Sequence, residues 1–511
     1  MEYFAWWNEA QKELAREAKK ATDELFIPMA ERCVWKKEFP WEALKEIGRR
    51  GWFGAVVPEK YGGRRADWGV TGACIIIEEL SRTGLLEFPY TQSVIGGIVQ
   101  LVDDGSEDQK ERWLPRMVTG DLLGVITMTE PYAGSDISAI ETTGRREGDY
   151  YVVNGKKRFQ TVTGAGHIYM IYVKTSDKPE DIRNHNHLTA LVLEKGTPGF
   201  TVEKIHDLMG MDGIYNGCLH LENVRIPVAN RLGEENKGWW VMMRGLNVER
   251  VMASAMVLGG MREGLRYAHQ HLERRVQFRQ LTGDVLTNQF KFVDMLADLS
   301  TARLGTYYTA YCADIGKDVP VQAASAKLFN TTAAMNNAIN AIQLMGGNGV
   351  CKYYPVERFM RNVKLIQIAA GTDEILRLVM YRMGLSIMAE DLKPPVRAID
   401  PDLGIPMPLG KTPPRKKVVN ENDVLLLLAE NYRVNAGLHM TMEDICELLN
   451  VSSEELTGYL GKLEEKGLAN LHRDRRGKIS LARASYKGLS NAHPQGYYVH
   501  FPTWVDTRDM F

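Results

Sequence analysis

One glutamate of this 511-residue chain stands in a setting that favours proton transfer. The segment GLNVERVMASA predicts a helix that begins near Leu246 and carries Glu249. Desolvation on an apolar helix face raises the pKa of a carboxyl group toward the range of a general base. Arg250 would temper that shift, and an ion pair between Glu249 and an arginine is the ordinary alternative. The residues predicted to share the face of Glu249 are small or apolar: Ala253, Met256 and Gly260.

A second group of acids follows in the segment IQIAAGTDEILRL, residues 366–378, which predicts the end of a loop leading into a helix. Thr372 is a good N-cap residue, and Asp373 and Glu374 would occupy the first helical turn. Acids are favoured there by the free N–H groups and the helix dipole, so capping is their ordinary role. Glu374 is therefore the weaker candidate for a base.

The surrounding elements divide the chain into a multidomain α+β protein. Residues 1–124 show helical periodicity and predict an N-terminal helical domain. Residues 125–238 contain short runs of β-branched and aromatic residues separated by turn residues, which predict a central β-barrel-like domain. Residues 239–392 return to helical spacing and predict a C-terminal four-helix bundle.

Two further segments follow the bundle. Residues 393–415 contain seven prolines and predict an extended linker. Residues 416–511 predict three helices, then a strand, a turn and a strand, and end in an aromatic tail. This order resembles a winged helix-turn-helix domain.

Composition excludes several classes of function. The net charge is −1, which provides no field to attract nucleic acid or an anionic membrane. The N-terminus shows no signal peptide, and no apolar run is long enough to span a bilayer. The six cysteines form no C-x-x-C pair, so neither a disulfide framework nor a metal site is indicated. We therefore expect a cytoplasmic protein without a bound metal.

Five motifs occur in an order that resembles the acyl-CoA dehydrogenase family over residues 10–390. In chain order they are MTEPYAGSD, YVVNGKKRFQT, RRVQF, AIQLMGGNGVCKYYPVERFMRN and AAGTDEILR. The family binds FAD and oxidises the Cα–Cβ bond of an acyl-CoA thioester, with a carboxylate removing the α-proton and flavin N5 receiving the β-hydride. The resemblance implies this fold, cofactor and reaction, and an electron-transfer flavoprotein or another acceptor as the redox partner.

The resemblance also implies residues that contact the flavin ring. Thr129 matches the residue that faces the flavin pyrimidine, and Phe159 stands where the family usually has tryptophan. Phenylalanine keeps the stacking surface but lacks the indole donor. The ordinary alternative for the Thr129 segment is a tight surface turn. The complete set implied around the flavin ring is Met128, Thr129, Ser135, Phe159, Thr161, Thr372 and Glu374.

The adenine end of FAD is implied to lie against other residues. Arg275 and Phe278 match residues that meet the pyrophosphate and adenine, although the chain has extra residues after Phe278. Gln343, Gly346 and Gly347 match a segment that a neighbouring subunit contributes. The resemblance therefore implies a homo-oligomer, either a tetramer or a dimer.

The family resemblance also addresses the base. Most members carry a glutamate where this chain has Ala370, whose methyl group cannot accept a proton. Isovaleryl-type and long-chain members place the glutamate on an earlier helix in a Leu-x-x-Glu-Arg context, which Glu249 matches here. Substrate contacts are implied for Ser135, Asn247, Arg250 and Gly371. The alternative is a flavin-bearing regulatory or scaffold protein, or a non-dehydrogenating family member.

The winged-helix-like part is an unusual addition to such an enzyme. Its third helix, expected to be the recognition helix, carries more acids than bases, which would repel phosphates. Only the predicted wing is basic, through Arg473, Arg475, Arg476 and Lys478. We therefore expect protein contact or assembly as its role, and nucleic acid as an unlikely partner.

Overall fold

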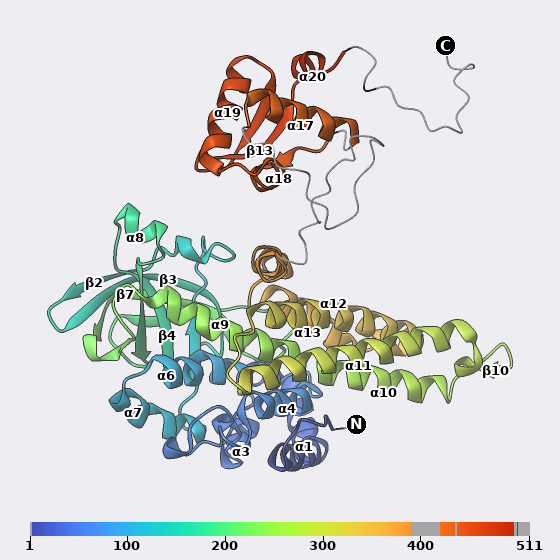
Figure 1. Ribbon diagram of the computed structural model, residues 1–511. Helices are drawn as coiled ribbons and strands as arrows, with labels where there is room; N and C mark the ends of the chain where they lie inside the picture. Colours follow the sequence, from blue (N-terminus) through green and yellow to red (C-terminus); the bar gives the residue numbers. More distant parts are fainter. Residues whose placement is uncertain (1–2, 390–418, 435–436, 495–497, 499–511) are drawn as a thin grey trace. The chain divides into compact units, whose positions relative to one another are not determined.

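The computed structural model describes residues 3–389, 419–434, 437–494 and 498. It contains two compact units, Met1–Ile387 and Met388–Phe511, which are described separately below (Figure 1). The linker predicted at residues 393–415 and most of the aromatic tail lie outside the described residues. No helix among the described residues is long and apolar enough to cross a membrane.

The first unit begins with a helical layer, as predicted. Its first helix is capped at Asn8, whose side chain accepts from the backbone N–H of Gln11, while the Gln11 side chain accepts from the backbone N–H of Asn8. The helices are α1 (Glu9–Ala21), α2 (Ile27–Lys36), α3 (Trp41–Arg49), α4 (Gly69–Ser81), α5 (Glu87–Ser93), α6 (Val99–Asp104) and α7 (Glu107–Val118).

A mixed sheet follows in the middle of the unit. Seven strands pair in the order β6-β7-β3-β2-β4-β5-β8, and β1 pairs in parallel with β4. The short α8 (Pro179–Arg183) joins β4 to β5. The strands are β1 (Gly124–Thr127), β2 (Thr143–Glu147), β3 (Tyr150–Thr161), β4 (Ile168–Lys174), β5 (Leu188–Glu194), β6 (Phe200–Ile205), β7 (Asn216–Pro227) and β8 (Arg231–Leu232).

The helical bundle of this unit extends away from the sheet (Figure 1). Its helices α10 and α11 are joined by a hairpin of β9 (Val276–Gln277) and β10 (Gln280–Leu281), which contains the extra residues after Phe278. The helices are α9 (Gly238–Ala255), α10 (Leu258–Leu272), α11 (Leu286–Asp314), α12 (Pro320–Met345), α13 (Val356–Ile368), α14 (Asp373–Val379) and α15 (Leu385–Ile387).

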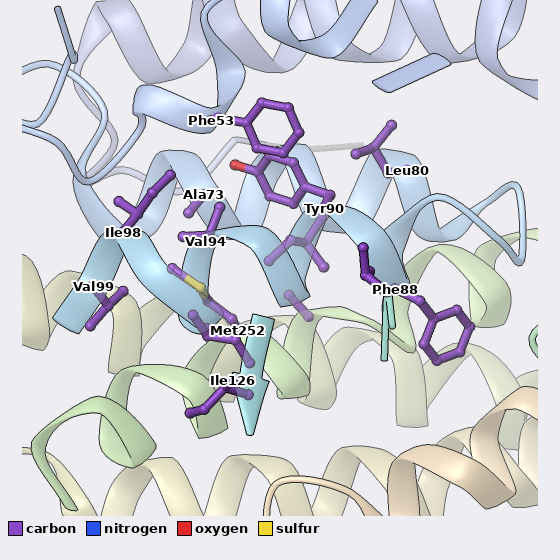
Figure 2. Packing of buried hydrophobic residues seen from close by; sticks show 14 of the residues in the cluster. Phe53, Ala73, Leu80, Phe88, Tyr90, Val94, Ile98, Val99, Ile126 and Met252 are labelled. Carbon is purple, nitrogen blue, oxygen red and sulfur yellow. The ribbon is translucent and has the colours of Figure 1, made fainter. Parts of the chain in front are cut away.

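The core is continuous from the helical layer through the sheet to the bundle. Between α5 and α6 the chain makes one π-helical turn, Val94–Ile98, so residues 87–104 form one helical run. Figure 2 shows Tyr90 of this run stacked against Phe53 on one side of it, and Ile126 of β1 and Met252 of α9 on the other side. The first layer, the sheet and α9 therefore meet at this helix.

The second unit has its own hydrophobic core. Its elements are α17 (Glu421–Val434), β11 (Met440–Thr441), α18 (Met442–Leu449), α19 (Ser453–Glu465), β12 (Ala469–Arg473), β13 (Ile479–Ala484) and α20 (Tyr486–Ala492). The strands form an antiparallel sheet in the order β11-β13-β12. The three helices and the β12–β13 hairpin were predicted in this order, whereas the short β11 and the helix α20 were not; the winged-helix assignment stays a prediction. Tyr498 of the tail donates its hydroxyl to the Leu489 carbonyl at 3.0 Å.

Candidate active site

Glu249 lies in the second half of α9 and is 7% exposed. Two details of the prediction are wrong: the helix begins at Gly238 rather than near Leu246, and it ends at Ala255. Gly260 therefore lies on α10 and not on the same helix as Glu249. The apolar surroundings of Glu249 come instead from packing of α9 against α4, α11 and α12.

The carboxyl group of Glu249 is buried without a hydrogen bond to its Oε2 among the described residues. Burial raises its pKa to about 7, while the nearby charges of Arg250 and Lys327 lower it. A carboxyl group with a pKa near neutrality can accept a proton and release it again at physiological pH. This is the electrostatic condition that a general base requires.

Arg250 is adjacent to Glu249 but does not form an ion pair with it. Its Nη1 donates to Asn247 Oδ1 at 3.4 Å, and its Nε lacks a partner among the described residues. Burial lowers the pKa of Arg250, since a charged guanidinium is desolvated there. The side chain therefore offers a buried donor that a bound ligand could satisfy.

The loop between α13 and α14 comprises residues 369–371 and the N-cap Thr372. The preceding residues belong to α13, which ends at Ile368, so the prediction of a loop over residues 366–368 is wrong. Ala370 and Gly371 both adopt left-handed backbone conformations, with φ values of 57° and 85°. A Cβ placed on Gly371 would lie 3.9 Å from Arg250 Nη2. The loop thus approaches the guanidinium through backbone atoms.

Lys327 of α12 binds this loop through hydrogen bonds. This residue was not identified from the sequence. Its Nζ is fully buried and donates to the Gly371 carbonyl and to Asp373 Oδ1, both at 3.0 Å. Asp373 also accepts from Thr331 Oγ1 at 3.1 Å. A signal was present, because Lys327 is spaced four residues from both Ala323 and Thr331 on the buried face of α12.

Both acids of α14 lie in its first turn, as predicted, but Asp373 binds Lys327 and Thr331 instead of capping the helix. Thr372 is the N-cap and accepts from the Ile375 backbone N–H at 3.3 Å. Glu374 is exposed, and its pKa is lowered by hydrogen bonds to its own backbone N–H and to Thr372. An exposed, ionised Glu374 therefore lacks the environment of Glu249.

The turn from Met128 to Ser135 carries further residues that the family resemblance implies for the cofactor. Buried Lys157 pairs with Glu130 at 2.7 Å, and Glu130 accepts from the Glu141 backbone N–H at 2.6 Å. The Thr129 carbonyl accepts from the backbone N–H of Arg158 at 2.8 Å. These bonds fix the turn to β3, whereas Ser135 at its end is exposed. Lys157 was a further residue that the sequence analysis missed.

Phe159 and Thr161 at the end of β3 provide an aromatic ring and a hydroxyl group. Phe159 is 48% exposed and has a φ of 61°, which is unusual for a bulky residue. Buried Asn216 donates to the Phe159 carbonyl at 3.2 Å and to Thr161 Oγ1 at 3.1 Å, while its own Oδ1 has no partner in the described part of the chain. An exposed aromatic ring beside the hydroxyl of Thr161, which Asn216 holds in place, suits contact with a flavin ring.

Family models match most of the first unit. The acyl-CoA dehydrogenase N-terminal, middle and C-terminal domain models match residues 8–121, 125–224 and 236–385. The chain belongs to the acyl-CoA dehydrogenase family. It is 36% identical to an acyl-CoA dehydrogenase of Bacillus subtilis (strain 168), over 70% of this chain and 92% of that protein.

Two further members of the acyl-CoA dehydrogenase family show the same extent of similarity. Mitochondrial isovaleryl-CoA dehydrogenase of Pongo abelii is 34% identical, over 73% of this chain and 88% of that protein. The solved structure of butyryl-CoA dehydrogenase from Megasphaera elsdenii is 32% identical with a TM-score of 0.72, and covers 75% of this chain and 100% of that one. As a member of this family, the chain is a flavoprotein oxidoreductase that uses FAD and acts on CH–CH bonds.

The remaining predicted cofactor residues of this acyl-CoA dehydrogenase lie elsewhere. Arg275 and Phe278 are on the exposed hairpin at the end of the bundle distant from the sheet (Figure 1). Phe278 is 95% exposed. Gln343, Gly346 and Gly347 are also exposed, where α12 ends toward the same part of the bundle. Within one chain they are therefore separated from Phe159 and Thr161.

Proposed function

We propose that the chain oxidises an acyl-CoA thioester to its α,β-unsaturated product, with Glu249 as the general base. The observation that carries this proposal is the buried carboxyl of Glu249, with a pKa of about 7 and no ion pair among the described residues. Ala370 offers no acid in the loop before α14, and Asp373 is paired with Lys327.

Different residues of the chain contribute cofactor binding, proton removal and substrate contact. Bound FAD supplies the acceptor for the hydride that leaves the β-carbon, and Phe159, Thr129 and Thr161 would hold its ring. Glu249 removes the α-proton onto its carboxylate. The Gly371 backbone and Arg250 border the thioester and limit water around it.

The direct test is anaerobic flavin reduction by a panel of acyl-CoAs, for wild type beside Glu249→Gln. We expect the variant to retain FAD and to lose at least ~10²-fold in reduction rate, the usual scale for a positioned base. A variant that reduces its flavin at the wild-type rate would remove Glu249 from the mechanism. Retained flavin without reduction by any acyl-CoA in wild type would favour the scaffold alternative.

We also propose that the enzyme is a homotetramer in which each FAD contacts two subunits. Support comes from Arg275, Phe278 and Gln343, whose polar and aromatic side chains are exposed. Apolar side chains of α11 between 49% and 59% exposed supply a surface for association: Leu286, Phe290, Val293, Leu296, Leu304 and Tyr308.

The remaining parts of the proposal concern partners and location. We propose an electron-transfer flavoprotein as the acceptor of the electrons and a cytoplasmic location, which the free state of all six cysteines supports. For the second unit we propose protein contact or assembly. In the predicted wing, Arg473 Nη1 donates to Glu464 Oε1 at 3.0 Å. This ion pair leaves fewer cations to bind the phosphate backbone of a nucleic acid.

A further inference from the structure

Asn216 is the first residue of β7 and lies opposite Thr161, its register partner at the end of β3. Backbone hydrogen bonds fix this end of β7. The His206 N–H donates to the Asn216 carbonyl at 2.7 Å, and the neighbouring Tyr215 carbonyl accepts from the Thr163 N–H at 3.1 Å. Asn216 is 5% exposed. The backbone therefore presents a buried amide to the end of β3 in a fixed position.

The orientation of this amide follows from its two contacts. Its Nδ2 lies 3.2 Å from the Phe159 carbonyl oxygen and 3.1 Å from Thr161 Oγ1. A backbone carbonyl can only accept a hydrogen bond, so the atom that faces it must be the NH2 group and not the amide oxygen. Both N–H bonds of Asn216 are then used, one on Phe159 and one on Thr161.

This orientation decides what the Thr161 hydroxyl can do. Its oxygen accepts from Asn216, and the amide nitrogen has no acceptor capacity to offer in return. Among the residues that the structure describes, no hydrogen bond is donated by Thr161 Oγ1, and Thr161 is only half-buried. The hydroxyl hydrogen therefore points away from Asn216 and is available to another group.

A donor at this place is complementary to the edge of an oxidised flavin ring. That edge presents ring nitrogens and carbonyl oxygens as acceptors, and only its N3–H as a donor. A hydroxyl that is held as a donor by a second residue loses less freedom on binding such an acceptor than one that can rotate between roles. The same amide binds the Phe159 backbone, so one side chain fixes both the donor and the residue with the exposed aromatic ring.

On this basis we propose that Asn216 is a positioning residue for FAD, which sets the Thr161 hydroxyl as a donor to an acceptor atom of the oxidised flavin ring. This inference rests on the proposed function, in which Phe159 and Thr161 hold the ring. If residue 216 accepted instead of donating, the Thr161 hydroxyl would turn toward it, and the flavin acceptor would be left unsatisfied.

The test is dilution of the full-length holoenzyme, with the fluorescence of released FAD giving the dissociation constant and the absorption spectrum reporting the bound flavin. Asn216→Asp keeps the size of the side chain but replaces the NH2 donor with a carboxylate oxygen. We expect about 10-fold weaker binding of FAD, the scale of one lost hydrogen bond, and a shifted flavin absorption band. Thr161→Val removes the hydroxyl itself and should weaken FAD binding to the same extent.

Two comparisons separate this role from a general loss of stability. Asn230→Asp is the matched control, since Asn230 is also 5% exposed, donates its Nδ2 to the Val192 carbonyl at 3.1 Å and lies beyond the other end of β7. It should keep the wild-type affinity for FAD. In the Thr161→Val background, Asn216→Asp should weaken FAD binding no further, because the hydroxyl through which Asn216 acts is absent.

The possible outcomes separate the inference from the function on which it rests. Normal FAD binding by both Asn216→Asp and Thr161→Val would overturn the placement of the flavin ring. A loss in only one of these variants, an equal loss in Asn230→Asp, or additive losses in the double variant would overturn the role of Asn216. The measurement does not require turnover, so failure to oxidise any acyl-CoA would contradict the proposed reaction alone.

Discussion

Lys327 and Asp373 form a buried ion pair, with Nζ 3.0 Å from Oδ1, and Lys327 Nζ also donates to the Gly371 carbonyl of the loop before α14. Lys327→Met would leave Asp373 buried without its cation, and removing one partner of such a pair costs about 3 to 5 kcal/mol. The free energy of unfolding, measured in urea, should fall accordingly. Lys60→Met is the matched control, because Lys60 pairs with Glu107 at the surface, where solvent screens the pair, and its loss should lower the free energy of unfolding far less. Equal losses in the two variants would contradict the assigned role of Lys327.

The reduction rate should depend on pH through Glu249. Its pKa in the folded protein is about 7, so the carboxylate that accepts the proton predominates above that pH and is lost below it. We expect the logarithm of the reduction rate over Kd to rise by about one per pH unit below 7 and to level off above it. Stopped-flow reduction between pH 5.5 and 8.5 measures this profile. A rate independent of pH over that range would argue against Glu249.

The same pKa has a consequence for stability. An acid whose pKa rises from its ordinary 4.5 to about 7 on folding destabilises the folded state, because the carboxylate is desolvated. The cost is absent below pH 4.5, grows as pH rises and is complete above 7, where it corresponds to about 3 kcal/mol. Glu249→Gln should therefore gain stability relative to wild type between pH 5 and 8. Unfolding curves at both pH values test this, and a constant difference between the two proteins would contradict it.

The exposed arginine of the hairpin allows a test of the shared cofactor site. Arg275→Gln should weaken FAD binding by roughly 10-fold, the scale of one lost charge-assisted contact to phosphate. Arg274→Gln is the matched control, since Arg274 is equally exposed and adjacent. FAD titration of apoprotein, with the mass of the assembly measured by light scattering, separates loss of cofactor from loss of association. Equal affinity in both variants would remove Arg275 from the cofactor site.

Deleting the residues after Lys393 should leave the first unit intact. Each unit has a hydrophobic core of its own, so we expect the core that surrounds Glu249 to form without the second unit. We expect flavin content and reduction rate to stay within about 2-fold of wild type, a difference of less than 0.5 kcal/mol. Loss of FAD from the truncated protein would show that the second unit supports the first.

The sequence alone determined the family, the order of helical and β segments and the position of the candidate base. These features depend on residue type and local spacing: five motifs in order, helical periodicity, and a Leu-x-x-Glu-Arg context together with Ala370. The sequence also predicted correctly that Thr372 caps a helix, because capping involves neighbours within one turn.

Only the tertiary structure decided which acid is unpaired. Asp373 and Glu249 are both buried, yet Lys327 reaches Asp373 from another helix and leaves Glu249 without an ion pair among the described residues. The start of α9 and the separation of Arg275 from Phe159 could likewise not be predicted from the sequence. Desolvation and ion pairing depend on groups that folding brings together from distant parts of the chain. The local spacing of residues does not show which of these groups will be in contact.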